Sequence, residues 1–501
     1  MKLIKNQDII QSIASALQFI SYYHPQDFIK AMYQAYQRET GTAAKNAIGQ
    51  ILINSKMSAL GKRPICQDTG LVVIYAQVGM EVKFEGDLSL QQMADAGTRL
   101  AYNSSSNPLR ASMVAPPIGL RTNTLDNTPA VLHVEIVPGD KLSLSVAAKG
   151  GGSENKARFA ILNPADDVVE WVVKQIKTLG AGWCPPGIIG LGIGGSPEKA
   201  LLMAKLALLE PINIDELKNK SKLNENDSLR LEIFHQINQL GIGAQGLGGK
   251  TTVLDVNLKT YPTHAASLPI ALIPNCAATR HIHFCLDGSG QVNLVPPNID
   301  DYPTIKPTEK QPRRIQVSDQ NSLRELKSGE TVLLSGKILT ARDAAHKKIQ
   351  EIINNGEQLS DYGINLANRM VYYVGPVAPI DGEVVGPAGP TTSGRMDRYT
   401  KLMLEKVKIA GMIGKSERNQ NTVDLIKKHR SIYFIAVGGA AFLIAKSIKA
   451  SKIIAFPELG MEAIYEFEIL DMPVTVAVDS LGNSIHQSGP EKFRISMGQP
   501  A

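Results

Sequence analysis

Three of the four cysteines lie in segments rich in proline, glycine and polar residues, which predict loops. They are Cys66 in PICQDTG, Cys184 in GWCPPG and Cys276 in PNCAATR. Structural cysteines usually lie inside apolar runs, whereas a loop can present its thiolate to a point shared with other loops. Three thiolates can hold a 4Fe–4S cluster and leave its fourth iron open to act as a Lewis acid. The spacing alone names no metal, so free thiols, catalytic groups and metal ligands all remain open interpretations.

The remaining cysteine, Cys285, lies in HFCLD and is interpreted as a buried or spare thiol. His281 and His283 are interpreted as polar residues packed near Cys276 and are left out of the core site. Four cysteines in a chain of 501 residues do not form the disulfide framework of a small secreted protein. No two of them make the C-x-x-C pair of a zinc or redox site. We therefore expect free thiols or ligands in a reducing compartment.

Three glycine-rich segments suggest other kinds of binding site. GLGIGG at 190–195 satisfies G-x-G-x-x-G and precedes a predicted helix, which favours a dinucleotide site and an NAD-dependent oxidoreductase. The strand-like run before it is short and interrupted by CPPG, which argues against that interpretation. GIGAQGLGGKT at 241–251 has alanine where a phosphate-binding loop needs glycine, so a tight turn is predicted. KGGGSEN at 149–155 predicts either a turn or a cradle for a ligand.

The overall composition is that of an ordinary globular protein. Its 53 basic and 47 acidic side chains give a net charge of +6, which is too mild for a nucleic-acid-binding surface. The opening residues carry polar side chains every few positions and predict a helix in place of a signal peptide. No run of about 18 apolar residues predicts a membrane segment. The protein is therefore expected to be cytoplasmic, without nucleic-acid or membrane partners.

The hydrophobic pattern predicts two α/β domains joined by a proline-rich linker. Strands are expected at 71–78, 131–137, 142–147, 251–258 and 268–273, and helices at 8–38, 43–59, 165–178, 197–210 and 227–239. Five prolines then lie between Val295 and Arg314 without a hydrophobic period. We predict a mixed α/β (α+β) fold with a cluster-binding domain over 1–295, a linker over 296–315 and a smaller α/β domain over 316–501.

Several longer motifs resemble those of a known enzyme family. They are CQDTG at 66–70, KGGGSEN at 149–155, CPPGIIGLGIGGSPEKA at 184–200, GIGAQGLGGKTT at 241–252, IPNCAATRHIH at 273–283, SGKILTARDAAHKK at 335–348, VGPAGPTTSGRMD at 385–397, MIGKSE at 412–417 and GMEAIYEFE at 460–468. In this order, and over nearly the whole chain, the sequence resembles the class I, iron–sulfur-dependent fumarate hydratases, with their α and β regions fused in one chain. The tartrate dehydratases are related to the same family.

The resemblance implies roles for particular residues. It implies that Cys66, Cys184 and Cys276 bind a 4Fe–4S cluster whose open iron binds a substrate carboxylate and the hydroxyl that is lost or gained. It implies Asp68 as the acid that protonates the departing hydroxyl and Thr391 as the group that takes the C3 proton, although threonine alone is a poor base. The substrate-binding residues that it implies for a dianion are Arg110, Arg342, Arg395 and Lys415, with Gln67, Gly151 and His264 nearby. The active site is then expected between the two domains.

The implied activity is the reversible hydration of fumarate to L-malate in the tricarboxylic acid cycle, by a homodimer. L-Tartrate and mesaconate remain open as substrates, although tartrate dehydratases usually divide the two regions between separate subunits. Two alternatives come from other classes. One is the NAD-dependent oxidoreductase, and the other is an iron–sulfur sensor without enzymatic activity, in which the basic residues of the second domain would have no purpose.

Overall fold

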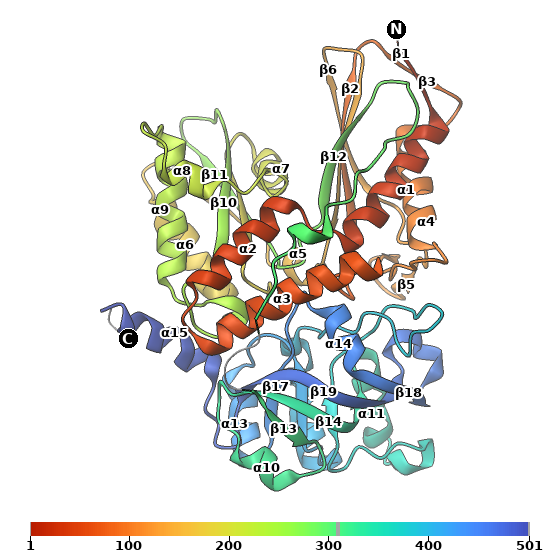
Figure 1. The fold of residues 1–501 in the computed structure, drawn as a ribbon, viewed down its shortest axis with the longest axis vertical. Coiled ribbons are helices and arrows are strands. Elements are labelled where there is room, and N and C mark those ends of the chain that lie inside the picture. The colour runs from red at the N-terminus through yellow and green to blue at the C-terminus, as the bar shows by residue number, and fades with distance from the viewer. Residues whose placement is uncertain (1, 307–310, 499–501) are drawn as a thin grey trace.

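The computed structural model describes residues 2–306 and 311–498. Figure 1 shows two parts, one above the other. We call the residues up to Leu286 the first part and the residues from Arg313 onward the second part. The first part contains two four-stranded sheets, and the second contains one seven-stranded sheet. This confirms the mixed α/β fold class and the two-domain architecture, whereas the exact boundaries remain a prediction.

Three helices open the chain, α1 (Asn6–Tyr22), α2 (Gln26–Arg38) and α3 (Thr42–Gly61). The predicted helical segment 8–38 is divided in two at Pro25, which stands at the N-cap of α2. Proline lacks the N–H that a helix interior needs, but it suits the start of a helix. The apolar side of α1 packs against α4 (Leu90–Tyr102), as the helical spacing of its isoleucines and leucine predicts.

The first sheet has the strand order β12-β7-β2-β6. Its strands are β2 (Leu71–Gly79), β6 (Val131–Val137), β7 (Leu142–Lys149) and β12 (His281–Leu286). Alternate residues of β2, including Val72 and Ile74, are buried in one core with α1 and α4, because successive side chains of a strand point to opposite faces. The central position of β2 fixes the CQDTG loop that immediately precedes it.

The second sheet has the order β10-β9-β11-β8 and lies between helices. Its strands are β8 (Arg158–Leu162), β9 (Gly187–Gly194), β10 (Val253–Tyr261) and β11 (Leu268–Asn275). Helices α6 (Val168–Leu179) and α9 (Glu225–Gln239) share one apolar core with it. On β9, a Cβ added at Gly192 would lie 2.1 Å from the Ala200 carbonyl oxygen of α7 (Pro197–Ala207). The glycines of GLGIGG therefore allow a helix to pack closely on a buried strand.

The second part is built on one sheet with the order β13-β14-β15-β16-β17-β19-β18. The strands are β13 (Arg313–Gln316), β14 (Thr331–Thr340), β15 (Met370–Tyr372), β16 (Gly411–Gly414), β17 (Ile432–Ile435), β18 (Ile448–Ala455) and β19 (Ile464–Val478). The helices are α10 (Gln320–Glu325), α11 (Asp343–Asn354), α12 (Asp397–Leu402), α13 (Gln420–Lys428) and α14 (Ala441–Ser447). The first five strands run parallel, and β19 pairs with both β17 and β14, so the sheet closes on itself.

Buried polar contacts join the two parts. The Asn54 side chain of α3 donates to the Gly439 carbonyl at 3.0 Å and accepts from the Phe442 amide at 2.9 Å. Arg63, only 1% exposed, forms an ion pair with Glu383 at 2.9 Å. The last helix, α15 (Ile485–Ser496), returns to pack against the first part. Breaking these contacts would leave charged and amide groups buried without partners, so the parts hold one another in a fixed arrangement.

Between the two parts, the described residues 287–306 and 311–312 have little regular structure. Among them, the short 3-10 turn Ile299–Asp301 is the only regular element, and β13 begins at Arg313, inside the segment predicted as a linker. Pro307 of that predicted linker lies outside the described residues. Over 2–306 and 311–498, no helix combines the length and apolar character needed to cross a membrane.

Candidate active site between the two parts

A cavity of about 390 Å³ lies between the two parts. Its lining residues are Gln67, Asp68, Arg110, Gly151, Gly152, Asn155, Lys156 and Gly182 from the first part, and Arg342, Thr391, Thr392, Gly394, Arg395 and Lys415 from the second. A larger hollow of about 620 Å³ lies elsewhere, over residues such as Tyr75 and Leu206. The smaller cavity is the better candidate because several cations, one carboxylate and the cysteine loops converge on it.

The structure brings the three predicted cysteines together. Cys66 follows α3, Cys184 precedes β9 and Cys276 follows β11, and all three are free thiols. Cys66 and Cys276 share one small buried group of side chains, and the Ala277 amide donates to the Cys184 carbonyl at 3.1 Å. We call Cys66, Cys184 and Cys276 the thiol site.

The electrostatics of the thiol site show how near these groups are to one another. Burial raises the pKa of the Cys184 thiol to about 11, with smaller contributions from the neighbouring Cys276 and Cys66 and against the opposing effect of Lys415. Burial likewise raises the pKa of the Cys66 thiol. Burial also opposes the charge of Lys415, but the nearby Cys184 and Cys66 thiolates raise its pKa overall. The site thus combines three sheltered sulfur donors with one fixed cation.

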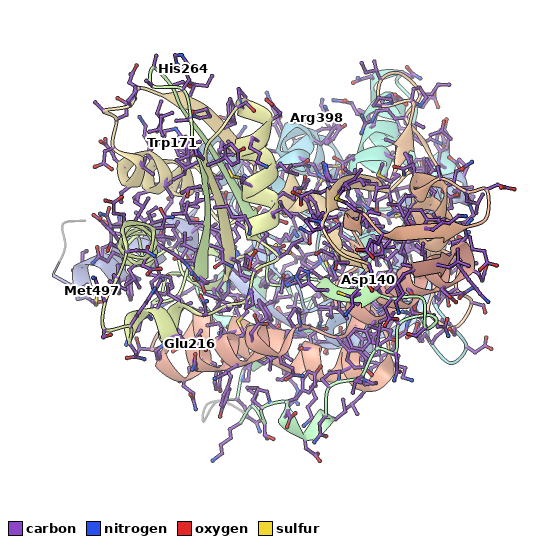
Figure 2. All side chains as sticks on the ribbon, turned by 90° about the horizontal axis from the view of Figure 1, so that it is seen from above. Asp140, Trp171, Glu216, His264, Arg398 and Met497 are labelled. Carbon is purple, nitrogen blue, oxygen red and sulfur yellow. The ribbon has the colours of Figure 1, made fainter. Side chains whose placement is uncertain are left out.

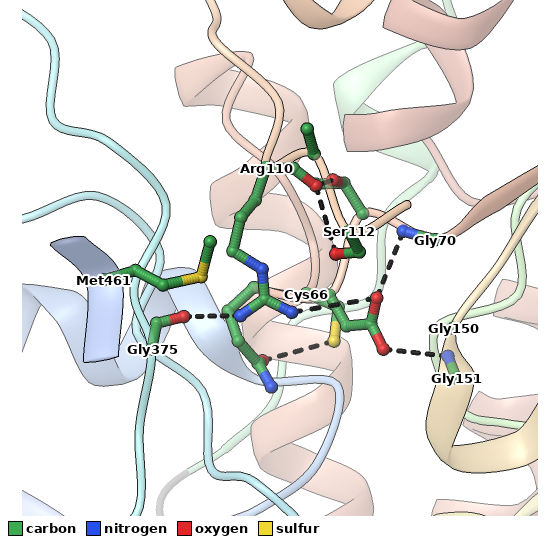
Figure 3. A network of polar contacts seen from close by, with 12 residues as sticks. Cys66, Gly70, Arg110, Ser112, Gly150, Gly151, Gly375 and Met461 are labelled. Atoms are coloured by element: carbon green, nitrogen blue, oxygen red, sulfur yellow. Dashed lines mark hydrogen bonds and ion pairs between the residues drawn. The ribbon is translucent and has the colours of Figure 1, made fainter. Parts of the chain in front are cut away.

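Asp68 lies two residues beyond Cys66, and its carboxylate has three polar partners, Gly70, Gly151 and Arg110, which are labelled in Figure 3. It accepts hydrogen bonds from the Gly70 amide at 3.2 Å and the Gly151 amide at 2.8 Å. The Arg110 guanidinium forms an ion pair with it at 3.8 Å. Burial works against its charge, but Arg110 and other cations together hold the pKa of Asp68 below its usual range. Asp68 is therefore a carboxylate at neutral pH, ready to accept a proton.

Two arginines face each other across the boundary between the parts. Arg110 donates to the Gly375 carbonyl at 2.6 Å, as Figure 3 shows, and Arg342 forms an ion pair with Glu462 at 3.4 Å. Burial lowers the pKa of Arg110 to about 10, and the neighbouring charge of Arg342 contributes to the decrease. Each guanidinium leaves its buried Nε without a hydrogen-bond partner among the described residues. Two like charges with unused donors beside a cavity are suited to binding an anion.

Thr391 and Lys415 come from neighbouring segments of the second part. The Thr391 amide donates to the Tyr373 carbonyl at 2.7 Å, and the Lys415 amide donates to the Thr391 carbonyl at 3.3 Å. Gln67 reaches across from the first part and donates to the Pro390 carbonyl at 3.0 Å. These backbone contacts fix the threonine hydroxyl and the lysine ammonium at the same cavity.

Both parts of the chain match sequence models of the same protein family. The sequence model of fumarate hydratase (fumerase) matches residues 10–285, and that of the fumarase C-terminus matches residues 288–489. The fumarate hydratase 2 of Leishmania major is 31% identical over 490 residues, which cover 93% of this chain and 84% of that protein. The aerobic class I fumarate hydratase of Escherichia coli (strain K12) is 33% identical over 462 residues, 87% of this chain and 82% of that protein. The chain belongs to the fumarate hydratase family.

One further relative of this member of the fumarate hydratase family matches about half of the chain. The putative L(+)-tartrate dehydratase subunit alpha of Methanocaldococcus jannaschii is 32% identical over 265 residues, 52% of this chain and 90% of that subunit. The relatives that span both parts of the chain are named fumarate hydratases.

The dinucleotide interpretation of GLGIGG does not agree with this fumarate hydratase fold. A phosphate-binding fingerprint places its glycines in the turn between a strand and a helix. Here the first glycines lie inside the buried strand β9 and serve the packing of α7. GIGAQGLGGKT forms tight turns with a short 3-10 helix at Ala244–Gly246, as predicted. In KGGGSEN the Gly151 amide contacts Asp68, so this segment borders the cavity.

Two predicted substrate-binding residues are less enclosed than the others in the fumarate hydratase site. Arg395 lines the cavity, but its side chain is 50% exposed and pairs with Asp343 at 3.3 Å. His264 lies on the exposed loop between β10 and β11, at the edge of the molecule in Figure 2. It does not line the cavity within this chain. Cys285 is exposed and lies beside Ser143, away from the thiol site.

Sequence reasoning missed several residues at this fumarate hydratase site, and three of them stand out. Thr392 and Gly152 line the cavity, and a Cβ added at Gly152 would lie 3.5 Å from Lys415 Nζ. Arg280 is buried, and none of its side-chain nitrogens has a hydrogen-bond partner among the described residues. All three stand inside or beside motifs that the sequence analysis singled out. Their types gave no signal by themselves, because threonine, glycine and arginine are common in loops and on surfaces.

Proposed function

We propose that the protein is a fumarate hydratase that interconverts fumarate and L-malate at the cavity between its two parts, using a 4Fe–4S cluster bound by the thiol site. The observation that carries this proposal is that the three thiols lie beside a cavity lined by the carboxylate of Asp68 and by the cations of the second part. Full-length similarity to fumarate hydratases supports the same reaction.

The thiol site fits a cluster better than a single metal ion. Over the described parts of the chain, no compact group of three histidine, cysteine or acidic side chains is placed to hold one ion. A cluster of four irons separates its cysteine ligands further than one ion does. Gly438 leaves space beside this site, because a Cβ there would lie 2.6 Å from Cys184 Sγ. When bound, the cluster supplies an open iron that acts as a Lewis acid toward the carboxylate and hydroxyl of the substrate.

The cations around the cavity bind the dianionic substrate. Arg342, Arg395 and Lys415, which we call the cationic wall, come from the second part, and Arg110 faces them from the first. A planar guanidinium can hold a carboxylate through two parallel hydrogen bonds, whereas the lysine acts as a point charge. Together they orient the substrate so that its double bond lies between the proton-transfer groups.

Asp68 and Thr391 handle the two protons of the reaction. In the hydration direction the Asp68 carboxylate takes a proton from water as the water oxygen adds to one alkene carbon. The Thr391 hydroxyl delivers a proton to the other carbon and regains one from solvent. In dehydration the two transfers run in reverse, so Asp68 returns its proton to the departing hydroxyl. Threonine is a weak base, and the positive charge of Lys415 at the same cavity makes its alkoxide less unfavourable.

The direct test is an assay on protein purified and reconstituted without oxygen. L-Malate is added to the parent and to Cys276→Ala, and fumarate is followed by its absorbance. Fumarate formation by the parent but not by the variant is the expected result. Iron and sulfide bound without fumarate formation would contradict the proposed substrate. No iron bound at all would contradict the cluster.

The same assay with L-tartrate and mesaconate tests the closest alternatives. Similarity of about half of the chain to a putative tartrate dehydratase subunit favours including tartrate. We expect fumarate and L-malate to give the highest kcat/KM, because similarity to fumarate hydratases spans both parts. A higher kcat/KM for tartrate or mesaconate would reassign the substrate within the same chemistry.

The proposal extends to the setting of the enzyme. We expect a cytoplasmic homodimer that serves the tricarboxylic acid cycle and needs neither a nucleic acid nor a membrane. Light scattering of the reconstituted protein at several concentrations measures the oligomeric state, and a mass of one chain throughout would contradict the dimer.

A further inference from the structure

Arg280 is buried in an unusual way. It stands four residues beyond Cys276, where its carbonyl accepts a hydrogen bond from the Ala148 amide at 3.0 Å. The residue is 2% exposed. Its Nε, Nη1 and Nη2 atoms find no hydrogen-bond partner among the residues that the structure describes. A guanidinium thus lies inside the protein with all of its donors unused.

Other buried arginines of this chain are paired. Arg63 reaches Glu383 and Asn107, and Arg418 reaches Asp397 and the Thr400 hydroxyl. Burial of an unpaired charge is costly, and a buried arginine normally satisfies its planar set of donors. The contrast indicates that Arg280 is prepared for an acceptor that the polypeptide itself does not supply.

The surroundings of Arg280 locate that acceptor. A Cβ added at Gly150 would lie 3.6 Å from Arg280 Nη2 and 3.5 Å from Asp68 Oδ2, so the guanidinium and this carboxylate approach the same glycine. The charge of Arg280 also acts on the Cys66 thiol, more strongly than that of Lys415. Neither Arg280 nor the three cysteines line the cavity that holds the cationic wall. Arg280 therefore belongs with the thiol site and not with the groups that bind the substrate.

We propose that Arg280 donates hydrogen bonds to the sulfur atoms of the cluster held by Cys66, Cys184 and Cys276, and compensates its negative charge. The inference rests on the proposed function and deepens it. Three thiolates on a doubly positive 4Fe–4S core leave a net negative charge, and that charge grows when the core gains an electron. Hydrogen bonds to cluster sulfurs and nearby positive charge favour the reduced form. Arg280 is thus a positioning residue for the cluster and not a catalytic residue.

Two consequences can be measured without assaying turnover. Removal of the guanidinium should lower the reduction potential of the cluster, because the more negative reduced state loses its compensating charge. It should also speed the loss of iron in air, because a more electron-rich cluster is oxidised more easily. Replacement by lysine keeps the charge but loses the planar set of donors, so its effects should have the same sign and be smaller.

The experiment compares four anaerobically reconstituted proteins: the parent, Arg280→Met, Arg280→Lys and Arg230→Met. Arg230 is the matched control because it is a sheltered arginine of the first part that already pairs with Asp255 at 2.9 Å. Iron and sulfide are counted per chain, and the midpoint potential is found by dithionite titration with EPR detection. Arg280→Met is expected to shift the redox equilibrium at least tenfold, about 59 mV for one electron. Arg230→Met is expected to leave it unchanged.

The outcomes separate this inference from the proposed function. A parent that takes up no cluster overturns both. A parent that holds the cluster and hydrates fumarate, with Arg280→Met at the same potential and the same rate of iron loss, overturns only the role of Arg280. An unchanged potential and rate of iron loss together with a raised KM for L-malate would mean that Arg280 binds the substrate and not the cluster.

A second measurement covers the case in which Arg280→Met does not fold. The parent is labelled with ¹⁵N-arginine, its cluster is reduced by dithionite, and pulsed EPR is recorded. Coupling of an arginine nitrogen to the cluster, lost in Arg280→Lys, is the expected result. No arginine coupling in the parent would overturn the inference.

Discussion

The thiol site and the cationic wall are proposed to serve one substrate, but the protein holds them in different ways. The thiols lie on loops at the ends of buried elements, and a backbone hydrogen bond joins the Cys184 loop to the Cys276 loop. The exposure of the side chains in the cationic wall increases from Lys415, which is 9% exposed, to Arg395, which is half-exposed. Rigid, sheltered groups suit the making and breaking of bonds, whereas cations that extend toward solvent suit the capture of a dianion. Changes at the thiol site should therefore reduce kcat, and changes in the cationic wall should raise KM.

The largest effect is expected for Cys184→Ala. Loss of one of three thiolate ligands should release the cluster and with it several kcal/mol of transition-state stabilisation, so kcat should fall by about 10³-fold or more. Iron content and kcat of the reconstituted variant measure this. Cys285→Ala is the matched control, because this thiol is exposed and lies beside Ser143. Equal losses in both variants would mean that the cysteines act through folding and not as ligands.

A smaller effect on kcat is expected for Asp68→Asn. The substitution keeps the shape but removes the proton acceptor, so kcat should fall by about 10²- to 10⁴-fold while KM changes little. In the parent, cations and amides lower the pKa of Asp68, so the group remains ionised at every pH above its ordinary value of 3.8. The hydration rate should accordingly show no loss from Asp68 titration near neutral pH. A change confined to KM would instead make Asp68 a binding residue.

In the cationic wall, Arg342→Met should act mainly on KM. Hydrogen bonds to charged groups contribute about 1.5–3 kcal/mol each, which corresponds to a rise of about 10- to 100-fold in the KM for L-malate. Steady-state kinetics separates KM from kcat. Lys337→Met is a suitable control, because this lysine of β14 is 61% exposed and pairs with Glu466 at 3.1 Å. An unchanged KM with a reduced kcat would remove the proposed distinction between the two regions.

The smallest effect is expected for Arg395→Gln. Exposed ion pairs contribute about 0–1 kcal/mol, so the KM should rise by less than about fivefold, and less at high salt. The measurement is KM at low and high ionic strength. A rise as large as that of Arg342→Met would show that Arg395 becomes enclosed when the substrate binds.

Much of this site was predictable because its residues stand in short, dense motifs. Cys66, Gln67 and Asp68 are consecutive, so one loop must carry all three to the same place. The three cysteines stood out by their unusual surroundings of proline and glycine. The role of GLGIGG could not be predicted from the sequence, because its pattern also matches a dinucleotide-binding fingerprint. Only the packing of α7 on β9 reveals that the glycines remove side chains between a helix and a strand.

The sequence by itself determined the two α/β domains, the helical character of the opening segment, and the resemblance that links the cysteines to a hydratase. These features depend on local periodicity and on neighbours in the chain. The tertiary structure decided which cations share the cavity, that His264 lies away from it within this chain, and that the buried Arg280 side chain has no hydrogen-bond partner among the described residues. Such properties depend on distances between segments far apart in the chain, and no local pattern encodes them.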